Sequence, residues 1–151
     1  MPDLFAMGQA VLASQPFSLL LGAELIKFSP EGTELRLPVS EQLKQQFGFI
    51  HGGVLAYLAD NAMTFAGALS LGATAVATSE MKINYIRPAL GGMLIARAAA
   101  MSAGRVQSVV RCEIYVVQDG EEKLCAAAQG TIVARDANAK SRCEAEDAPA
   151  R

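Results

Sequence analysis

Residues 49–71 read FIHGGVLAYLADNAMTFAGALSL, a glycine pair followed by an almost wholly apolar run. The glycines mark a turn, and the run predicts one long helix that ends near Leu71 and Gly72. A helix that is apolar on nearly every side is a buried helix. Asp60 lies inside it, and a buried carboxylate is costly unless it is hydrogen-bonded, paired or used in chemistry. Asp60 and His51, the only histidine of the chain, are therefore the first candidates for function.

The segments on either side of this helix carry strand patterns, in which apolar and polar residues alternate. We expect a covering helix over 4–12, a further turn of helix over 16–21, a hairpin of strands over 23–29 and 33–39, and later strands over about 75–86, 93–101, 105–117 and 123–134. A lone apolar helix has to be covered, and a curved antiparallel sheet wrapped around it does so. The sequence thus predicts the α+β class.

The length of 151 residues and the hydrophobic share of 52% predict one domain over 1–134. Residues 135–151 are polar and aperiodic, and we expect a disordered tail. No apolar run is expected to reach the roughly 18 to 20 residues that a membrane span needs, and the first residues lack the basic region of a secretory signal. A cytoplasmic protein without a membrane partner is the expectation.

Charge and cysteine content exclude several classes of partner. The net charge of −2 comes without a dense Lys/Arg cluster, which argues against nucleic acid and favours a small-molecule ligand. Cys112, Cys125 and Cys143 are scattered and predict neither a disulfide framework nor a metal site. The uncovered flank of the long helix and a free sheet edge predict a homo-oligomer.

Three motifs occur together: GFIHGG at 48–53, ADNA at 59–62 and MKINYIRP at 81–88. Their combination resembles the hotdog-fold acyl-CoA thioesterases of the phenylacetate-pathway type, over roughly residues 17–134. The resemblance implies a hotdog fold, in which a curved antiparallel sheet wraps one central helix. It also implies hydrolysis of an acyl-CoA thioester by a homodimer or homotetramer, without a metal or redox cofactor.

The resemblance assigns roles to individual residues. It makes Asp60 the nucleophile or general base and places the oxyanion contact on the backbone N–H of Gly53. It gives His51 a supporting role at the turn or at the thioester carbonyl. Gln45 stands where the family often has a water-positioning asparagine, six residues before the histidine. The longer side chain of Gln45 changes the reach of that contact.

Further candidates follow from the same motifs. A hydroxyl residue eighteen positions after the aspartate assists in some relatives, and Thr78 stands there, although alternation counted from Met81 directs its side chain away from the core. The candidate substrate- and CoA-binding residues are Gly52, Asn61, Thr64 and Arg87. Gly52 lets a substrate approach the backbone closely, and Arg87 suits phosphate. Asn61 and Thr64 fit a subunit interface equally well, and Arg87 fits a solvated sheet face.

The spacing of Gly53 and Asp60 has its own consequence. The N–H groups at a helix N-terminus suit an oxygen on which negative charge develops. Seven residues separate the two positions, so they share a side of the helix but lie about 10 Å apart along it. One carbonyl cannot contact both. Two antiparallel copies of the helix would bring Gly53 of one chain to Asp60 of the other, which predicts two composite sites per dimer.

Two other functions stay open at this point. One is a non-catalytic acyl-CoA binding module, and the other is an acyl-thioester hydratase or dehydratase in which His51 is the base. Asp60 alone also fits a structural carboxylate at an interface. The acyl group is not defined by the sequence, because Phe47, Tyr57, Met63 and Phe65 fit a pocket lining and the core equally well.

Overall fold

The computed structural model describes residues 3–135 of the chain. The helices are α1 (Leu4–Ala13), α2 (Pro16–Leu21) and α3 (Gly52–Leu71), with a short 3-10 turn at Glu41–Leu43. The strands are β1 (Glu24–Ser29), β2 (Gly32–Pro38), β3 (Val76–Tyr85), β4 (Met93–Ala103), β5 (Gln107–Gln118) and β6 (Glu121–Ala134). This order confirms the predicted helices, the first hairpin and the four later strands. The predicted tail lies outside the described residues, apart from Arg135.

The local sequence explains where the helices begin and end. Asp3 caps α1, because its side chain accepts a hydrogen bond from the N–H of Phe5 at 3.0 Å. Gly22 closes α2 and Gly72 closes α3, with φ of 80° and 59°. Glycine adopts this left-handed conformation without the steric cost of a Cβ atom.

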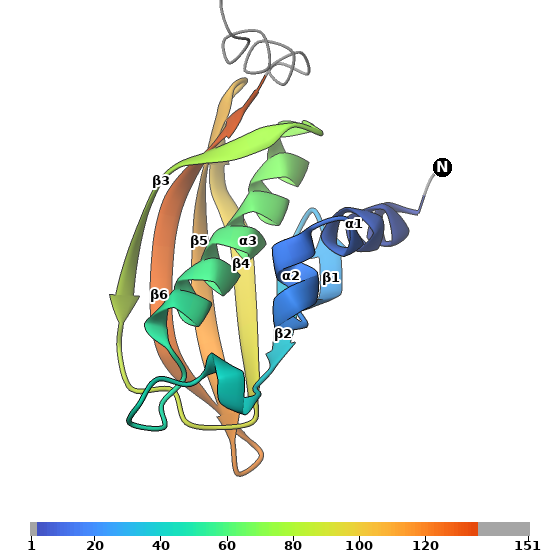
Figure 1. The fold of residues 1–151 in the computed structure, drawn as a ribbon. Coiled ribbons are helices and arrows are strands. Elements are labelled where there is room, and N and C mark those ends of the chain that lie inside the picture. Colours follow the sequence, from blue (N-terminus) through green and yellow to red (C-terminus); the bar gives the residue numbers. More distant parts are fainter. Residues whose placement is uncertain (1–2, 136–151) are drawn as a thin grey trace, which may run out of the picture.

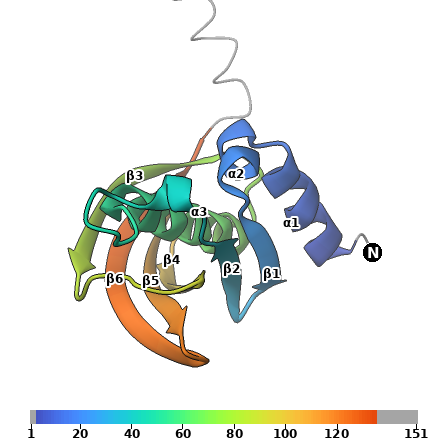
Figure 2. The ribbon, with the colours of Figure 1, turned by 60° about the horizontal axis from the view of Figure 1, so that its bottom comes forward.

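The six strands form one antiparallel sheet in the order β1-β2-β4-β5-β6-β3. The sheet curves around α3, which lies across its concave side (Figures 1 and 2). The helices α1 and α2 lie near β1, at the end of the sheet away from β3 (Figure 1). The predicted hotdog architecture is confirmed. We call the side that faces α3 the inner side of the sheet and the opposite side the outer side.

The helix α3 has two unlike faces. One face is buried against the sheet, and its residues are Val54, Leu55, Leu58, Ala59, Ala62, Met63, Phe65, Ala66 and Gly67. On the other face Asp60, Asn61 and Thr64 are half-buried. The sequence predicts one uncovered flank on this helix, and no element of the described residues covers this second face completely. Asp60 lies on the open face.

The length of α3 corrects one expectation. By length and composition its 20 residues would be enough to cross a membrane. We expected no such run, but Asp60 is the only charged residue between Gly52 and Leu71. The core helix of a folded domain passes the same test, and α3 packs against the sheet as such a helix does.

The inner side of the sheet holds the core. In β5 the side chains of Ser108, Val110, Cys112, Ile114 and Val116 are all buried, as the alternation predicts. Burial raises the pKa of the Cys112 thiol to about 12 and that of the Cys125 thiol to about 11. Both cysteines are free thiols, and Cys143 lies outside the described residues. The inner side therefore keeps its two thiols protonated.

Candidate active site

Asp60 is held by a hydroxyl from the neighbouring strand. The Oγ1 of Thr78, in β3, donates a hydrogen bond to Oδ1 of Asp60 at 2.5 Å. The other carboxylate oxygen, Oδ2, has no hydrogen-bond partner among residues 3–135. A carboxylate that is oriented through one oxygen and open at the other is suited to accept a proton or to attack a carbonyl carbon.

A bulge in β3 turns Thr78 toward Asp60. Thr78 pairs with Ile132 and Glu80 pairs with Thr131, so Ser79 is an extra residue without a partner on β6. One extra residue reverses the alternation of side chains on one side of the bulge. The expectation that Thr78 points away from the core is therefore wrong, because it assumed unbroken alternation from Met81.

Thr64 completes a small polar group around Asp60. It follows Asp60 by one helical turn, and its Oγ1 donates to the backbone oxygen of Asp60 at 2.8 Å. The same Oγ1 lies 3.2 Å from the Oγ1 of Thr78. The structure thus brings together Asp60, Thr64 and Thr78, all of which are sequence candidates.

The glycine turn forms a separate group at the start of α3. His51 is the N-cap residue, and its Nδ1 accepts a hydrogen bond from the N–H of Gly53 at 2.8 Å. The His51 backbone N–H donates to the oxygen of Leu43 at 2.8 Å, which ties the turn to the preceding loop. His51 thus stabilises the turn. The N–H of Gly53 is engaged within the chain, whereas that of Gly52 has no acceptor among the described residues.

Gln45 belongs to the loop before the helix. Its backbone N–H donates to the oxygen of Phe49 at 2.8 Å, and its side-chain oxygen accepts from the N–H of Phe47. Within residues 3–135 the Gln45 side chain forms no hydrogen bond with Asp60. The structure therefore places Gln45 with the loop and the glycine turn, about two helical turns from the carboxylate.

Asn61 lies beside Asp60 but bonds in another direction. Its Nδ2 lies 3.1 Å from the hydroxyl oxygen of Tyr57 and 3.3 Å from Oγ of Ser18, a residue of α2. The Tyr57 hydroxyl also donates to Ser18 Oγ at 2.6 Å, and Ser18 is 1% exposed. Sequence reasoning missed Ser18, because its partners are 39 and 43 residues away along the chain. These bonds hold α2 against α3.

Arg87 follows β3 at the exposed end of the sheet, and its backbone N–H donates to the oxygen of Cys125 at 3.3 Å. Its side chain forms no ion pair among the described residues. Tyr85, two residues earlier, donates from its hydroxyl to the backbone oxygen of Gly52 at 3.3 Å. Arg87 therefore lies two residues after the side chain that contacts the glycine turn.

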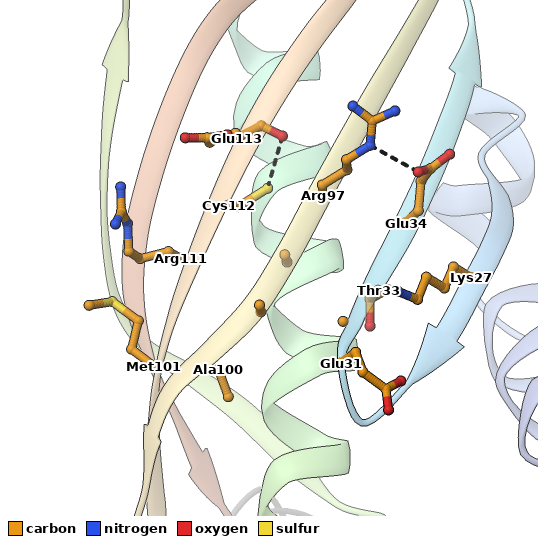
Figure 3. A pocket seen from close by; sticks show the side chains of 13 residues that line it. Lys27, Glu31, Thr33, Glu34, Arg97, Ala100, Met101, Arg111, Cys112 and Glu113 are labelled. Atoms are coloured by element: carbon orange, nitrogen blue, oxygen red, sulfur yellow. Dashed lines mark hydrogen bonds and ion pairs between the residues drawn. The ribbon is translucent and has the colours of Figure 1, made fainter.

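A groove of about 550 Å³ lies on the outer side of the sheet, and we call it the outer groove (Figure 3). Arg97 donates from Nε to Glu34 at 3.0 Å, and from its other two nitrogens to Glu122 at 2.7 and 2.8 Å. The bonds to Glu122 and then to Glu34 raise the pKa of the Arg97 guanidinium. None of the predicted site residues lines this groove. Arg97 and Glu34 are thus paired, whereas Lys27, Glu31, Arg111 and Glu113 of the lining form no ion pair among the described residues.

Residues 3–135 contain no group of three or more His, Cys, Asp or Glu side chains arranged to hold a metal ion.

Comparison with known proteins identifies the family. A sequence model described as the thioesterase superfamily matches residues 47–123, just over half of the chain. The chain belongs to the thioesterase superfamily. This thioesterase-superfamily chain is 34% identical over 114 residues to a protein of Haemophilus influenzae described as an esterase, covering 74% of this chain and 80% of that protein.

Two further relatives extend the comparison. The thioesterase-superfamily chain is 28% identical to a 1,4-dihydroxy-2-naphthoyl-CoA hydrolase of Listeria monocytogenes, over 70% of this chain and 85% of that one. Its structure matches the PaaI protein of the Escherichia coli phenylacetic acid degradation operon with a TM-score of 0.76, at 24% identity, over 89% of this chain and 97% of that one. The expected fold and the expected class of thioester-hydrolysing enzyme are confirmed.

Proposed function

We propose that the protein hydrolyses an acyl-CoA thioester to a free acid and coenzyme A, with Asp60 as the reacting carboxylate. The observation that carries this proposal is the state of the Asp60 carboxylate, which is hydrogen-bonded through one oxygen and open at the other. Thr78 fixes Oδ1, and Oδ2 stays open on the uncovered face of α3. The similarity to a CoA thioester hydrolase of Listeria monocytogenes supports coenzyme A as the leaving group.

Asp60 has two ways to do this chemistry. As a general base, its Oδ2 takes a proton from a water whose oxygen adds to the thioester carbon; the carbon–sulfur bond then breaks and the thiolate of coenzyme A takes up a proton. As a nucleophile, Oδ2 itself adds to the carbon, expels the thiolate and forms an anhydride that water hydrolyses. Neither route requires a metal or redox cofactor.

The carbonyl oxygen needs donors that Asp60 cannot supply. The N–H groups of Gly52 and Gly53 lie at the N-terminus of α3, where the helix dipole favours negative charge. Gly53 bonds to His51 within the chain, so the ring must turn away or share that N–H when substrate binds, whereas Gly52 is ready to donate. Within one chain these groups lie about 10 Å from Asp60 along the helix.

A second copy of the chain would bring the glycine N–H groups of one chain close to Asp60 of the other. The strand β3 is an edge of the sheet, and the face of α3 that carries Asp60 is incompletely covered. A twofold dimer that joins these two surfaces sets the antiparallel α3 helices side by side. Each site then takes Asp60 and Thr78 from one chain and the glycine turn from the other, giving two composite sites per dimer.

The first test is the release of free thiol from a panel of aryl and straight-chain acyl-CoAs. We expect the wild type to hydrolyse some members and Asp60→Asn to lose at least about a hundredfold in rate, since the amide can neither accept the proton nor attack. Asp119→Asn, in the exposed turn before β6, is the matched control and should keep full activity. Hydrolysis by Asp60→Asn at the wild-type rate, with both proteins folded, would falsify the proposal.

Mixed dimers test the composite site. Gly53→Pro removes one backbone donor in the first helical turn, and the His51 ring has to move, because a Cβ atom at Gly53 would lie 2.9 Å from its Nδ1. If the site is composite, unfolding and refolding Asp60→Asn together with Gly53→Pro gives heterodimers with one intact site, and about a quarter of wild-type activity returns. No recovery from well-folded heterodimers would show that both groups act within one chain.

The variant His51→Ala distinguishes the hydratase function from thioester hydrolysis. A hydratase in which His51 is the base would lose all activity in this variant and keep it in Asp60→Asn. In the structure, Nδ1 of His51 accepts a hydrogen bond from the N–H of Gly53 and so caps the helix. We therefore expect His51→Ala to weaken hydrolysis through the turn while Asp60→Asn abolishes it.

A further inference from the structure

An apolar chamber of about 360 Å³ lies between α1 and the C-terminal half of α3, and we call it the inner chamber. Leu4, Met7 and Val11 line it from α1, and Phe65, Ala68 and Leu69 line it from α3. Within residues 3–135, no charged side chain lines it. Its volume falls within the range of small-molecule sites, which begins at about 300 Å³.

The helix α1 leaves this chamber open instead of packing on α3. Leu4, Met7 and Val11 form one apolar stripe at helical spacing, yet Met7 is 48% and Val11 53% exposed. Gly8 explains the placement, because a Cβ atom there would lie 2.7 Å from Leu25 and from Phe28. The glycine thus allows α1 to rest closely on β1, and the stripe faces the chamber without a partner.

The chamber begins beside the proposed catalytic carboxylate. Thr64 is part of its lining and donates to the backbone of Asp60 at 2.8 Å, while Thr78, 3.2 Å from Thr64, holds Asp60 Oδ1. From Thr64 the lining continues to Gly72, about 12 Å further along the helix and away from the glycine turn. A molecule in the chamber therefore extends from Asp60 toward the end of α3.

We propose that the inner chamber holds the acyl group of the substrate, and this rests on the proposed function. The acyl group is apolar and uncharged, either an aryl group or an unbranched chain, and the stripe of α1 sets its length. A carboxylate at the far end of the acyl group would find no cationic partner in this lining, so we expect it to be disfavoured there. Of the four pocket candidates from the sequence, Phe65 lines the chamber, whereas Met63 is fully buried in the core and Phe47 is 74% exposed on the loop.

Two substitutions on α1 change the chamber in opposite directions. Val11→Phe fills it, and Met7→Ala enlarges it; both sites are exposed, so the fold tolerates the change. Ala6→Phe is the matched control, since Ala6 is exposed on another side of α1 and outside the lining. The assay is kcat/KM for straight-chain acyl-CoAs of rising length, for one aryl-CoA and for one acyl-CoA that ends in a carboxylate.

We expect Val11→Phe to lower kcat/KM for the longest accepted chain by at least about tenfold while the shortest is unchanged. Met7→Ala should move the preferred length upward, and Ala6→Phe should leave the profile as in the wild type. An unchanged profile in folded Val11→Phe overturns the proposal. Hydrolysis of the carboxylate-ended substrate as fast as its uncharged analogue of equal length also overturns it.

A binding measurement separates this proposal from the proposed function. Calorimetric titration of the same acyl-CoAs into Asp60→Asn and into Asp60→Asn/Val11→Phe reports occupation of the chamber without turnover. If the wild type hydrolyses nothing but affinity rises with chain length and Val11→Phe removes the rise, the chamber holds the acyl group and hydrolysis is wrong. If affinity is independent of chain length in both proteins, the inner chamber does not hold the acyl group. The proposal that the protein hydrolyses acyl-CoA is unaffected by that result.

Discussion

The outer groove and the inner chamber differ in chemistry more than in size. The outer groove is the larger, and charged side chains line it, of which Arg97 and Glu34 pair with each other. The inner chamber is smaller and mostly apolar, and its lining includes Thr64, which donates a hydrogen bond to the backbone of Asp60. Volume alone would favour the outer groove over the site that we propose. A polar atom without a hydrogen-bond partner next to an apolar surface is the better sign of a binding or catalytic site.

The largest expected effect concerns the thiols on the inner side. Burial raises the pKa of the Cys112 thiol to about 12 and that of the Cys125 thiol to about 11, whereas the pKa of an unfolded thiol is near 9.0. Above pH 9 the unfolded state therefore binds fewer protons than the folded one, and stability falls as pH rises, by up to ~1.4 kcal/mol per pH unit for each thiol. Urea unfolding at pH 8, 9 and 10 measures the slope.

The double variant Cys112→Ala/Cys125→Ala is the comparison for that slope. It keeps every other titrating group, so its stability should fall less steeply above pH 9 than that of the wild type. Equal slopes would mean that the inner side does not hold these thiols in the neutral form.

The next effect tests how closely α3 packs on the inner side. A Cβ atom on Gly67 would lie 2.6 Å from Cβ of Ile132, an atom that cannot move without its strand. Gly67→Ala should therefore lower the free energy of unfolding by about 2 kcal/mol. Gly92→Ala is the control, because a Cβ atom there has nothing within 4 Å. Equal stability of the two variants in urea unfolding would show that the helix has room to shift.

A third effect concerns the hydrogen bond that orients Asp60. Thr78→Val keeps the shape of the side chain but removes the donor to Oδ1, and a bond to a charged group accounts for about a tenfold change. We expect kcat to fall by about that factor with KM little changed, and Thr78→Ser to restore it. Ser79→Ala, at the exposed bulge, is the control for the thiol-release assay. A loss in KM alone would indicate a binding role for Thr78.

The smallest effect belongs to the outer groove. Arg97→Met breaks the bonds to Glu34 and Glu122, but exposed ion pairs contribute little, so we expect at most about 1 kcal/mol of stability to be lost. Arg111→Met, in the same groove, is the control without an ion pair among the described residues. Thiol release should be unchanged in both variants. A tenfold loss of activity in either would move the site toward the outer side.

The sequence predicted the fold well where local patterns decide it. Alternation placed β5, and the Asp119-Gly120 pair marked the hairpin that follows, where both residues have positive φ as the turn requires. The apolar run from Val54 marked α3. The two faces of α3 could not be told apart in this way, because alanine and glycine occur on both and only the sheet decides which is covered.

The contacts of the candidate site could not be predicted from the sequence. Asp60, Thr64 and Thr78 were all candidates, but the direction of Thr78 depends on Ser79, and serine carries no local signal for a bulge as glycine often does. Ser18 was missed for a related reason. Its partners on α3 lie far along the chain, and only the folded packing of α2 brings them within reach.

The bulge at Ser79 makes β3 respond differently to deletion than to substitution. Beyond Ser79, Met81 and Ile83 pack on the core, and before it Val76 and Thr78 point to the same side, so both sets meet α3 only because one residue is extra. If Ser79 were deleted, only one of two sets of side chains could still face α3: Met81 and Ile83, or Val76 and Thr78. A single lost codon could therefore remove the hydrogen bond between Thr78 and Asp60 while every named site residue is still encoded.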